Sequence, residues 1–159
     1  MAQQVGEAAD AETLVRVGPE ALSHDAAVAF VTTDDCGAVA TFLGVTRDSF
    51  EGKRVVRLSY EAYVPMAEAK MRAIAAAARS KFGVRRVACL HRVGEVGVGE
   101  ASVVIAMASP HRRDALSGVA WAIDELKATV PIWKKEVYAE AAPAWKANAE
   151  WDPDKVPSE

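Results

Sequence analysis

The sequence predicts an α+β fold built on a mixed β-sheet. Short apolar or alternating runs, which are typical of strands, are interspersed with three longer segments of helical periodicity. Their order is strand, helix, strand, strand, helix, strand, strand, helix, strand, and this order favours helices packed on a mixed sheet. The glycines match neither a phosphate-binding loop nor a dinucleotide fingerprint, so no nucleotide-binding motif is predicted.

Length and composition indicate a single globular domain. The 159 residues are enough to bury a substantial core. The 19 basic and 22 acidic side chains leave a net charge of -3, which gives no sign of nucleic-acid or membrane binding through overall charge. Any anion site must therefore be local. We expect disorder over residues 1–11, one domain over 12–151 and a frayed tail over 152–159.

Metal, cofactor and targeting signals are not found in the sequence. The two cysteines and three histidines lack the spacing of a disulfide framework or a metal cluster, so we predict no metal site and no cofactor. The N-terminus lacks the basic flank and apolar core of a signal peptide. No apolar run approaches the length needed to cross a bilayer. The sequence is therefore typical of a cytoplasmic protein.

The first half of the chain alternates between strand-like and helical runs. We expect strands at 13–17, 36–45 and 55–63, and helices at 20–31 and 66–82. The second strand is nearly all apolar, which predicts burial, and Gly44 within it suggests a bend or the close approach of another chain segment. Gly83 is suited to end the second helix. Residues 47–54 are charged and contain a glycine, so we expect a mobile loop there.

The second half has the same character and contains the longest helix. We expect strands at 84–93, 101–108 and 132–138, a turn region at 94–100 and a helix from 110 to 130. Ser109 is a suitable cap for this helix, and Pro110 fits its first position, where no backbone donor is needed. Val130 precedes Pro131, and a residue before proline is pushed out of the helical region.

Two features of the long helix are unusual for a helix that only packs. His111, Arg112 and Arg113 crowd its N-terminus, where the helix dipole favours negative charge, so an anion would be bound well there. Lys127 lies on the apolar stripe, and a lysine in such surroundings can serve as a base, nucleophile or acid. Structural explanations remain for both, because a basic first turn can be solvated and Lys127 can extend past the edge of the stripe.

Several segments resemble one known family in order and spacing. The matching runs are GAVATFLGVTRDSFEG, LSYEAYVPMAEAKM, LHRVGEVGVGEASVVIAMASPHRRDA, ELKATVPIWKKE and WKANAEW, and together they cover roughly residues 13 to 151. This ordered set is similar to the large, catalytic subunit of molybdopterin synthase. The resemblance implies an α/β hammerhead-like fold with a mixed sheet and additional antiparallel strands.

The resemblance also implies an activity and partners. Such proteins are sulfurtransferases that convert cyclic pyranopterin monophosphate to molybdopterin by adding the two dithiolene sulfurs. The sulfur arrives on a small ubiquitin-like subunit as a C-terminal thiocarboxylate, whose tail enters a pocket on the large subunit. The large subunit forms a homodimer with one small subunit at each end, a heterotetramer. No nucleic acid or membrane partner is implied.

Site residues are carried over by motif. The resemblance makes Lys127 and Lys134 the catalytic lysines of the pocket. It makes Arg47, His111 and Arg112 substrate-binding residues, and the last two would hold the phosphate. Phe42, on the strand leading to the loop arginine, is expected to line the pocket.

Two positions depart from the family pattern. Relatives often carry a basic residue where this chain has Ala149. Two outcomes are open: Lys146 or Arg113 compensates for its loss, or phosphate binding is weaker. The loop arginine is often followed by asparagine, whereas this chain has Asp48, an acid that could hold Arg47 in place or partly neutralise its charge.

Other readings of the sequence remain open. One alternative is a non-catalytic module that binds a pterin or nucleotide anion for regulation or assembly, since a fold alone does not define an activity. A persulfide relay through Cys36 or Cys89 is a weaker alternative, because only His91 and Arg92, close to Cys89, could activate either thiol.

The predicted pocket contains both Lys127 and His111, and the distance between them is too long for a single chain to supply both. The two residues lie 16 positions apart, roughly 24 Å along one helix. We therefore predict that His111 and Arg112 reach the lysines of a second subunit across a two-fold interface.

Overall fold

The computed structural model describes residues 10–140 and 144–147. The expected disorder of residues 1–9, the frayed tail at 152–159 and the departure at Ala149 lie outside the described residues, as does the side chain of Lys146. None of the described helices is both long enough and apolar enough to span a membrane.

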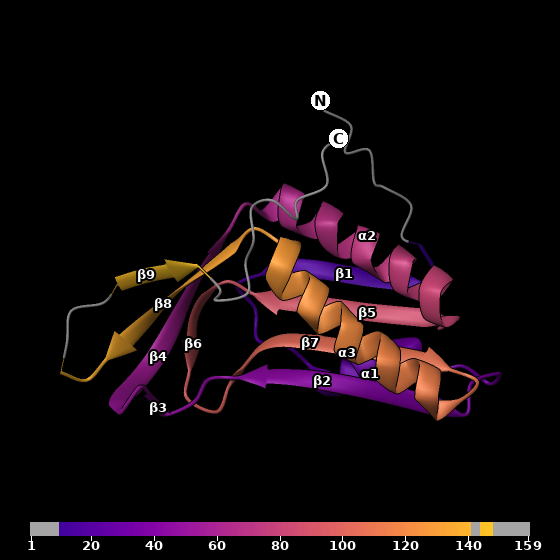
Figure 1. The fold of residues 1–159 in the computed structure, drawn as a ribbon, viewed down its shortest axis with the longest axis horizontal. Coiled ribbons are helices and arrows are strands. Elements are labelled where there is room, and N and C mark those ends of the chain that lie inside the picture. The colour runs from indigo at the N-terminus through magenta and orange to yellow at the C-terminus, as the bar shows by residue number, and fades with distance from the viewer. Residues whose placement is uncertain (1–9, 141–143, 148–159) are drawn as a thin grey trace.

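Four strands form the mixed sheet that the sequence predicts (Figure 1). In spatial order they are β1 (Thr13–Gly18), β5 (Arg86–Arg92), β7 (Ala101–Ser109) and β2 (Ala38–Val45). β1 runs parallel to β5, whereas β5 with β7 and β7 with β2 are antiparallel. The fold class is therefore confirmed as α+β.

Helices cover both faces of this sheet. α2 (Val64–Phe82) and α3 (Arg112–Thr129) pack on one face, and α1 (His24–Val31) packs on the other (Figure 1). Successive residues of β5 and β7 alternate between the two cores, so Cys89 faces α2 and α3 while Leu90 faces α1. Burial on both faces explains why these central strands have almost continuous apolar sequences.

A second, antiparallel sheet lies beside the first at the C-terminal end of β5 (Figure 1). It contains β3 (Ser49–Phe50), β4 (Lys53–Ala62), β8 (Ile132–Tyr138) and β9 (Ala144–Ala147), and β6 (Gly94–Gly97) pairs with β4 as well. β6 falls in the region predicted as a turn. Its four residues are too few for a periodic signal, so only the pairing with β4 reveals the strand.

The predicted start of the long helix is wrong. Ser109 pairs with Ala38 as the last residue of β7 and is fully buried, so it cannot cap the helix. The N-cap is His111, whose side chain makes no capping hydrogen bond. The chain remains extended to His111 because strand pairing continues one residue past the apolar run. The three basic residues still stand at the helix N-terminus.

The start of α1 and the segment predicted as a mobile loop also differ from the predictions. α1 begins at His24, four residues later than expected, because the Ser23 side chain caps it by accepting a hydrogen bond from the Ala26 N–H at 3.1 Å. The segment predicted as a mobile loop contains a tight hairpin between β3 and β4. Its two turn residues, Glu51 and Gly52, both have positive φ angles, 50° and 74°, as a two-residue hairpin turn requires.

Candidate functional site

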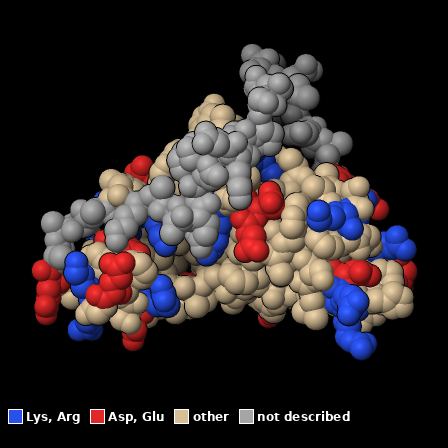
Figure 2. Space-filling model, viewed as in Figure 1, with Lys and Arg blue, Asp and Glu red and all other residues tan. Residues whose placement is uncertain are grey.

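A cavity of about 420 Å³ opens where the two sheets meet. Its walls come from the end of β2 and the segment after it, from β4, β5 and β7, from the last turns of α3, and from β8. On the face of the molecule shown in Figure 2, acidic and basic side chains are intermixed, without a large area of one sign. Any preference for an anion must therefore come from the cavity itself, as the modest net charge indicates.

Four of the six predicted site residues line this one cavity. They are Phe42 from β2, Arg47 from the segment after β2, Lys127 from the last turn of α3 and Lys134 from β8. Both lysines are partly buried. The β4–β8 pairing places Lys134 opposite Tyr60, and both side chains face the cavity. Residues far apart in the chain thus meet because two sheets and a helix converge.

His111 and Arg112 do not line the cavity. They stand at the N-terminal end of α3, whereas Lys127 is in its last turn. The helix has 18 residues, so its ends are separated by roughly 27 Å. The geometry of one chain therefore keeps the predicted phosphate-binding pair apart from the predicted catalytic lysines.

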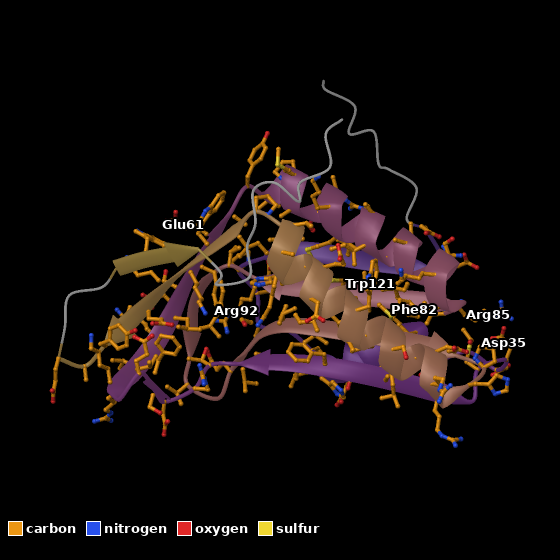
Figure 3. All side chains as sticks on the ribbon, viewed as in Figure 1. Asp35, Glu61, Phe82, Arg85, Arg92 and Trp121 are labelled. Carbon is orange, nitrogen blue, oxygen red and sulfur yellow. The ribbon has the colours of Figure 1, made fainter. Side chains whose placement is uncertain are left out.

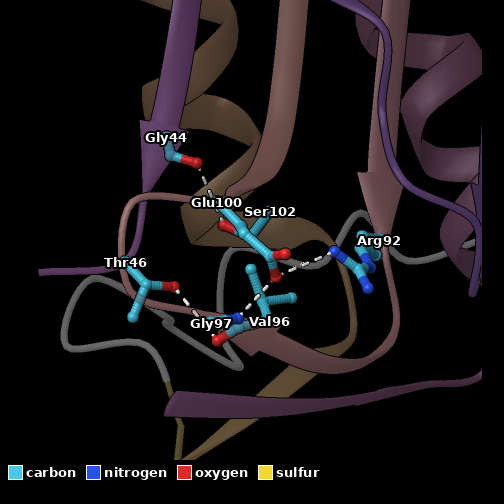
Figure 4. Close-up of polar contacts among 7 residues, drawn as sticks. All are labelled: Gly44, Thr46, Arg92, Val96, Gly97, Glu100 and Ser102. Carbon is cyan, nitrogen blue, oxygen red and sulfur yellow. Dashed lines mark hydrogen bonds and ion pairs between the residues drawn. The ribbon is translucent and has the colours of Figure 1, made fainter. Parts of the chain in front are cut away.

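The backbone before Arg47 is held from two sides, next to a turn whose side-chain contacts are shown in Figure 4. The Thr46 N–H donates to the Glu100 carbonyl at 3.1 Å, and the Gly99 N–H donates to the Thr46 carbonyl at 2.9 Å. The Glu100 carboxylate accepts hydrogen bonds from the Gly97 N–H at 2.7 Å and from Nη1 of Arg92 at 3.2 Å. These contacts, called here the Glu100 clasp, determine where the segment carrying Arg47 leaves the sheet.

Gly44 allows the strand to turn toward the cavity. A Cβ built on Gly44 would lie 2.5 Å from Cγ1 of Val103, closer than real side chains approach. The register of β2 against β7 also shifts between Gly44 and Val45. The close approach expected from the sequence is therefore present, and it redirects the chain just before Arg47. The Arg47 guanidinium lies 5.5 Å from the centre of the Phe50 ring.

Sequence reasoning missed five polar residues that line the cavity in the described part of the chain, namely Ser49, Tyr60, His91, Ser102 and Glu136. The Tyr60 hydroxyl donates to Oγ of Ser102 at 3.2 Å, and Ser102 donates to the Gly44 carbonyl at 3.4 Å. Burial raises the pKa of Tyr60, and the Glu136 charge raises it further. A histidine and a glutamate inside strand-like runs were available signals, because polar residues are rarely buried without a role or a partner.

The charge within the cavity is mixed but mainly positive. Among the described residues, three cationic side chains, Arg47, Lys127 and Lys134, share the cavity with one anionic side chain, Glu136. Glu136 is buried and accepts a hydrogen bond from the Tyr138 hydroxyl. A single buried carboxylate among three cations leaves the cavity suited to an anionic ligand.

Neither cysteine lines the cavity. Cys89 is buried in the core, and burial raises the pKa of its thiol to about 12, which disfavours the reactive thiolate. Cys36 precedes the far end of β2, and its thiol donates to the Asp35 carboxylate at 3.6 Å. Among the described residues, no group of histidine, cysteine, aspartate and glutamate could hold a metal ion.

Comparison with known proteins connects the chain to one family. The sequence profile described as MoaE protein matches residues 17–129. A relative named molybdopterin synthase catalytic subunit, from Bos taurus, is 50% identical over 137 residues, which cover 86% of this chain and 72% of the relative.

Solved structures agree with this relationship. The structure of molybdopterin synthase from Staphylococcus aureus matches with a TM-score of 0.77 at 34% identity, covering 85% of this chain and 95% of that one. A chain in the complex of subunits 1 and 2 of molybdopterin-converting factor from Helicobacter pylori has the same fold, with a TM-score of 0.65 at 20% identity, covering 87% of this chain and 92% of that one.

Proposed function

The chain belongs to the MoaE protein family, and from this membership we infer that it is the catalytic subunit of molybdopterin synthase. We propose that it is a sulfurtransferase which moves sulfur from a thiocarboxylated small subunit to cyclic pyranopterin monophosphate. The observation that carries the proposal is the cavity, in which Arg47, Lys127 and Lys134 converge from three separate segments.

The cations suit both reactants. The substrate carries a phosphate, and the sulfur donor carries a thiocarboxylate, so each brings negative charge into the cavity. An arginine can bind a phosphate through two parallel N–H donors, which suits Arg47. Lysine side chains from two different elements can stabilise the negative charge that develops on the acyl oxygen when water attacks the acyl–sulfur bond.

The two lysines are also suited to donate and accept protons during the reaction. The thiocarboxylate sulfur attacks a carbon of the pterin side chain and forms a carbon–sulfur bond. The carbon–oxygen bond at that carbon breaks, the oxygen leaves as water or on the phosphate group, and the sulfur stays acylated by the carrier. Water then cleaves the acyl–sulfur bond, so that the carrier leaves as a carboxylate and the sulfur stays on the pterin. Each addition needs a group that gives or takes a proton at the side chain, and Lys127 and Lys134 are the amines within the cavity.

We propose a homodimer with one small subunit at each end. The complex of subunits 1 and 2 from Helicobacter pylori supports a small-subunit partner, because one of its chains shares this fold. The separation of His111 and Arg112 from the cavity supports a dimer, since a second chain could bring this pair to the lysines. The cytoplasmic location expected from the sequence stays a prediction.

A non-catalytic anion-binding module would need the arginine but not the lysines. Both lysines line the cavity, and this favours the enzyme.

The decisive experiment combines the chain, the pterin monophosphate and a thiocarboxylated small subunit from the same organism. Mass spectrometry should detect a product that has gained two sulfur atoms. The matched control is the same small subunit ending in an ordinary carboxylate, which should give no product. Binding of the pterin without any sulfur addition, under conditions where a known synthase is active, would favour the non-catalytic module.

A further inference from the structure

His91 is a buried polar residue of the cavity to which no role has yet been given. It lies near the C-terminal end of β5, pairs with Val103 of β7 and is 5% exposed. Arg92, labelled in Figure 3, follows it where β5 ends beside the second sheet. The imidazole meets the Tyr60 ring edge-on, with centroids 5.1 Å apart and planes inclined at 73°. This packing fixes the orientation of the ring at the wall of the cavity.

The hydrogen bond of His91 defines its tautomer. Nδ1 lies 2.8 Å from the backbone carbonyl oxygen of Arg92. A carbonyl oxygen only accepts hydrogen bonds, so Nδ1 must carry the proton. Burial lowers the pKa of His91 to about 4, so the ring is neutral near pH 7. Nε2 is then a bare nitrogen with a lone pair.

No described residue donates to this lone pair. The nearby hydroxyls are committed elsewhere, because Tyr60 donates to Ser102 and Ser102 donates to the Gly44 carbonyl. The hydrogen bonds among the described residues include none to Nε2. An acceptor held rigidly at a cavity wall is costly unless a ligand or water satisfies it.

We propose that Nε2 of His91 accepts a hydrogen bond from an N–H group of the pterin ring and so determines which way the ring lies. This inference rests on the proposed function. The phosphate and the thiocarboxylate carry acceptor oxygens and sulfur, so neither can satisfy Nε2. The pterin ring carries amide and amino N–H donors. Arg47, Lys127 and Lys134 are donors suited to the anionic groups, and His91 is an acceptor suited to the ring.

Two substitutions distinguish the hydrogen-bonding role of Nδ1 of His91 from that of Nε2. His91→Asn places an amide near Nδ1, so it can keep the donor to the Arg92 carbonyl while removing the acceptor at Nε2. His91→Gln reaches the position of Nε2 and can present its amide oxygen there. His24→Asn, on α1 at the opposite face of the sheet, is the matched control. Thermal unfolding of each variant gives the folded fraction to which binding is normalised.

Binding of the pterin monophosphate is measured by titration calorimetry, and binding of the small subunit is measured separately. We expect His91→Asn to weaken pterin binding about tenfold, as loss of one buried hydrogen bond does. The pterin affinity of His91→Gln should stay within about threefold of that of the wild type. The affinity for the small subunit should not change in either variant. Pterin affinity that is unchanged in His91→Asn, or lost equally in both variants, overturns the proposal.

Nitrogen NMR of the wild-type protein tests the same point without a substitution. The Nε2 signal should be that of an unprotonated nitrogen and should shift toward a hydrogen-bonded value when the pterin is added, but not when the thiocarboxylated small subunit is added. A proton on Nε2, or no shift with saturating pterin, overturns the proposal. Failure of the proposed function can be told apart from failure of this inference, because in that case the wild-type chain makes no dithiolene product.

Discussion

The backbone of Thr46 is hydrogen-bonded to that of Glu100, and this contact places the residue next to Arg47 against the turn between β6 and β7. The Glu100 side chain stabilises the same turn through the Gly97 N–H and the Arg92 guanidinium. The position of a predicted substrate-binding arginine thus depends on a glutamate far along the chain.

Glu100→Ala should therefore affect both stability and substrate binding. It removes two hydrogen bonds and leaves Arg92, whose Nε is already buried without a partner among the described residues, with a second unpaired donor. We expect a loss of about 1–3 kcal/mol in the free energy of unfolding and a raised KM for the pterin. Glu95→Ala is the control. It breaks an exposed ion pair with Arg57, which is worth about 0–1 kcal/mol. Equal effects of the two substitutions on KM would contradict the assigned role of the clasp.

Removing either cavity amine should abolish most turnover without unfolding the protein. Lys127→Ala and Lys134→Ala each delete a partly buried amine that lines the cavity, and loss of a proton-transfer group typically costs on the order of 100-fold in rate. Single-turnover assays measure the rate of each variant, and circular dichroism shows whether the variant is folded.

Lys135→Ala provides the control for the lysines. Successive strand residues point to opposite faces, and the Lys135 ammonium lies 4.5 Å from the centre of the Trp145 ring. This variant should keep near-normal turnover. Near-normal product formation by Lys127→Ala would remove that lysine from the catalytic assignment.

The buried His91 should make stability depend on pH. Its pKa is lowered from 6.5 to about 4, so between these values the unfolded chain binds a proton that the folded chain does not. The free energy of unfolding should therefore fall as the pH is lowered from about 6.5 to about 4, by on the order of 3 kcal/mol in total.

Urea unfolding at several pH values, compared between the wild type and His91→Gln, isolates this contribution. Tyr60, Glu136, Lys127 and Lys134 line the same cavity and are present in both proteins, so their titration cancels in the difference to first order. A difference in unfolding free energy that does not vary with pH would show that His91 titrates normally.

The hairpin that follows Arg47 should be protected when the small subunit binds. The pair β3 and β4 is joined by a two-residue turn beside the cavity, and we expect the tail of the partner to dock there. Hydrogen exchange of residues 47–54 should slow with a saturating small subunit. Exchange in α1, on the opposite face of the first sheet, should stay the same. Unchanged exchange in the hairpin would place the docking surface elsewhere.

Mixed dimers test whether the pocket is shared between chains. Lys127→Ala and Arg112→Ala subunits, each inactive alone, are mixed in equal amounts and allowed to exchange. If His111 and Arg112 act on the cavity of the other chain, half of the dimers contain one intact site, and activity should recover to roughly a quarter of the wild type. Activity no greater than that of the parents, after subunit exchange is demonstrated, would mean that each pocket belongs to a single chain.

Sequence by itself determined the order of the longer strands and helices and the unusual character of the long helix, but not the short strands β3, β6 and β9. Local periodicity is enough to separate strands from helices, because side chains repeat every two residues in one and every 3.6 in the other. The same periodicity placed Lys127 on the apolar stripe of α3. The sequence also showed that basic residues crowd the N-terminus of this helix. The assignment of Lys134 and Arg47 to the same pocket depended instead on the family resemblance.

Only the tertiary structure decided which side chains meet. The pairing of β6 with β4, the continuation of β7 to Ser109 and the convergence of two sheets around His91 and Tyr60 are contacts between distant segments. No local pattern encodes them, since they depend on strand register and on burial against partners elsewhere in the chain. The same non-local geometry leaves His111 outside the cavity, because a rigid helix holds its two ends a fixed distance apart.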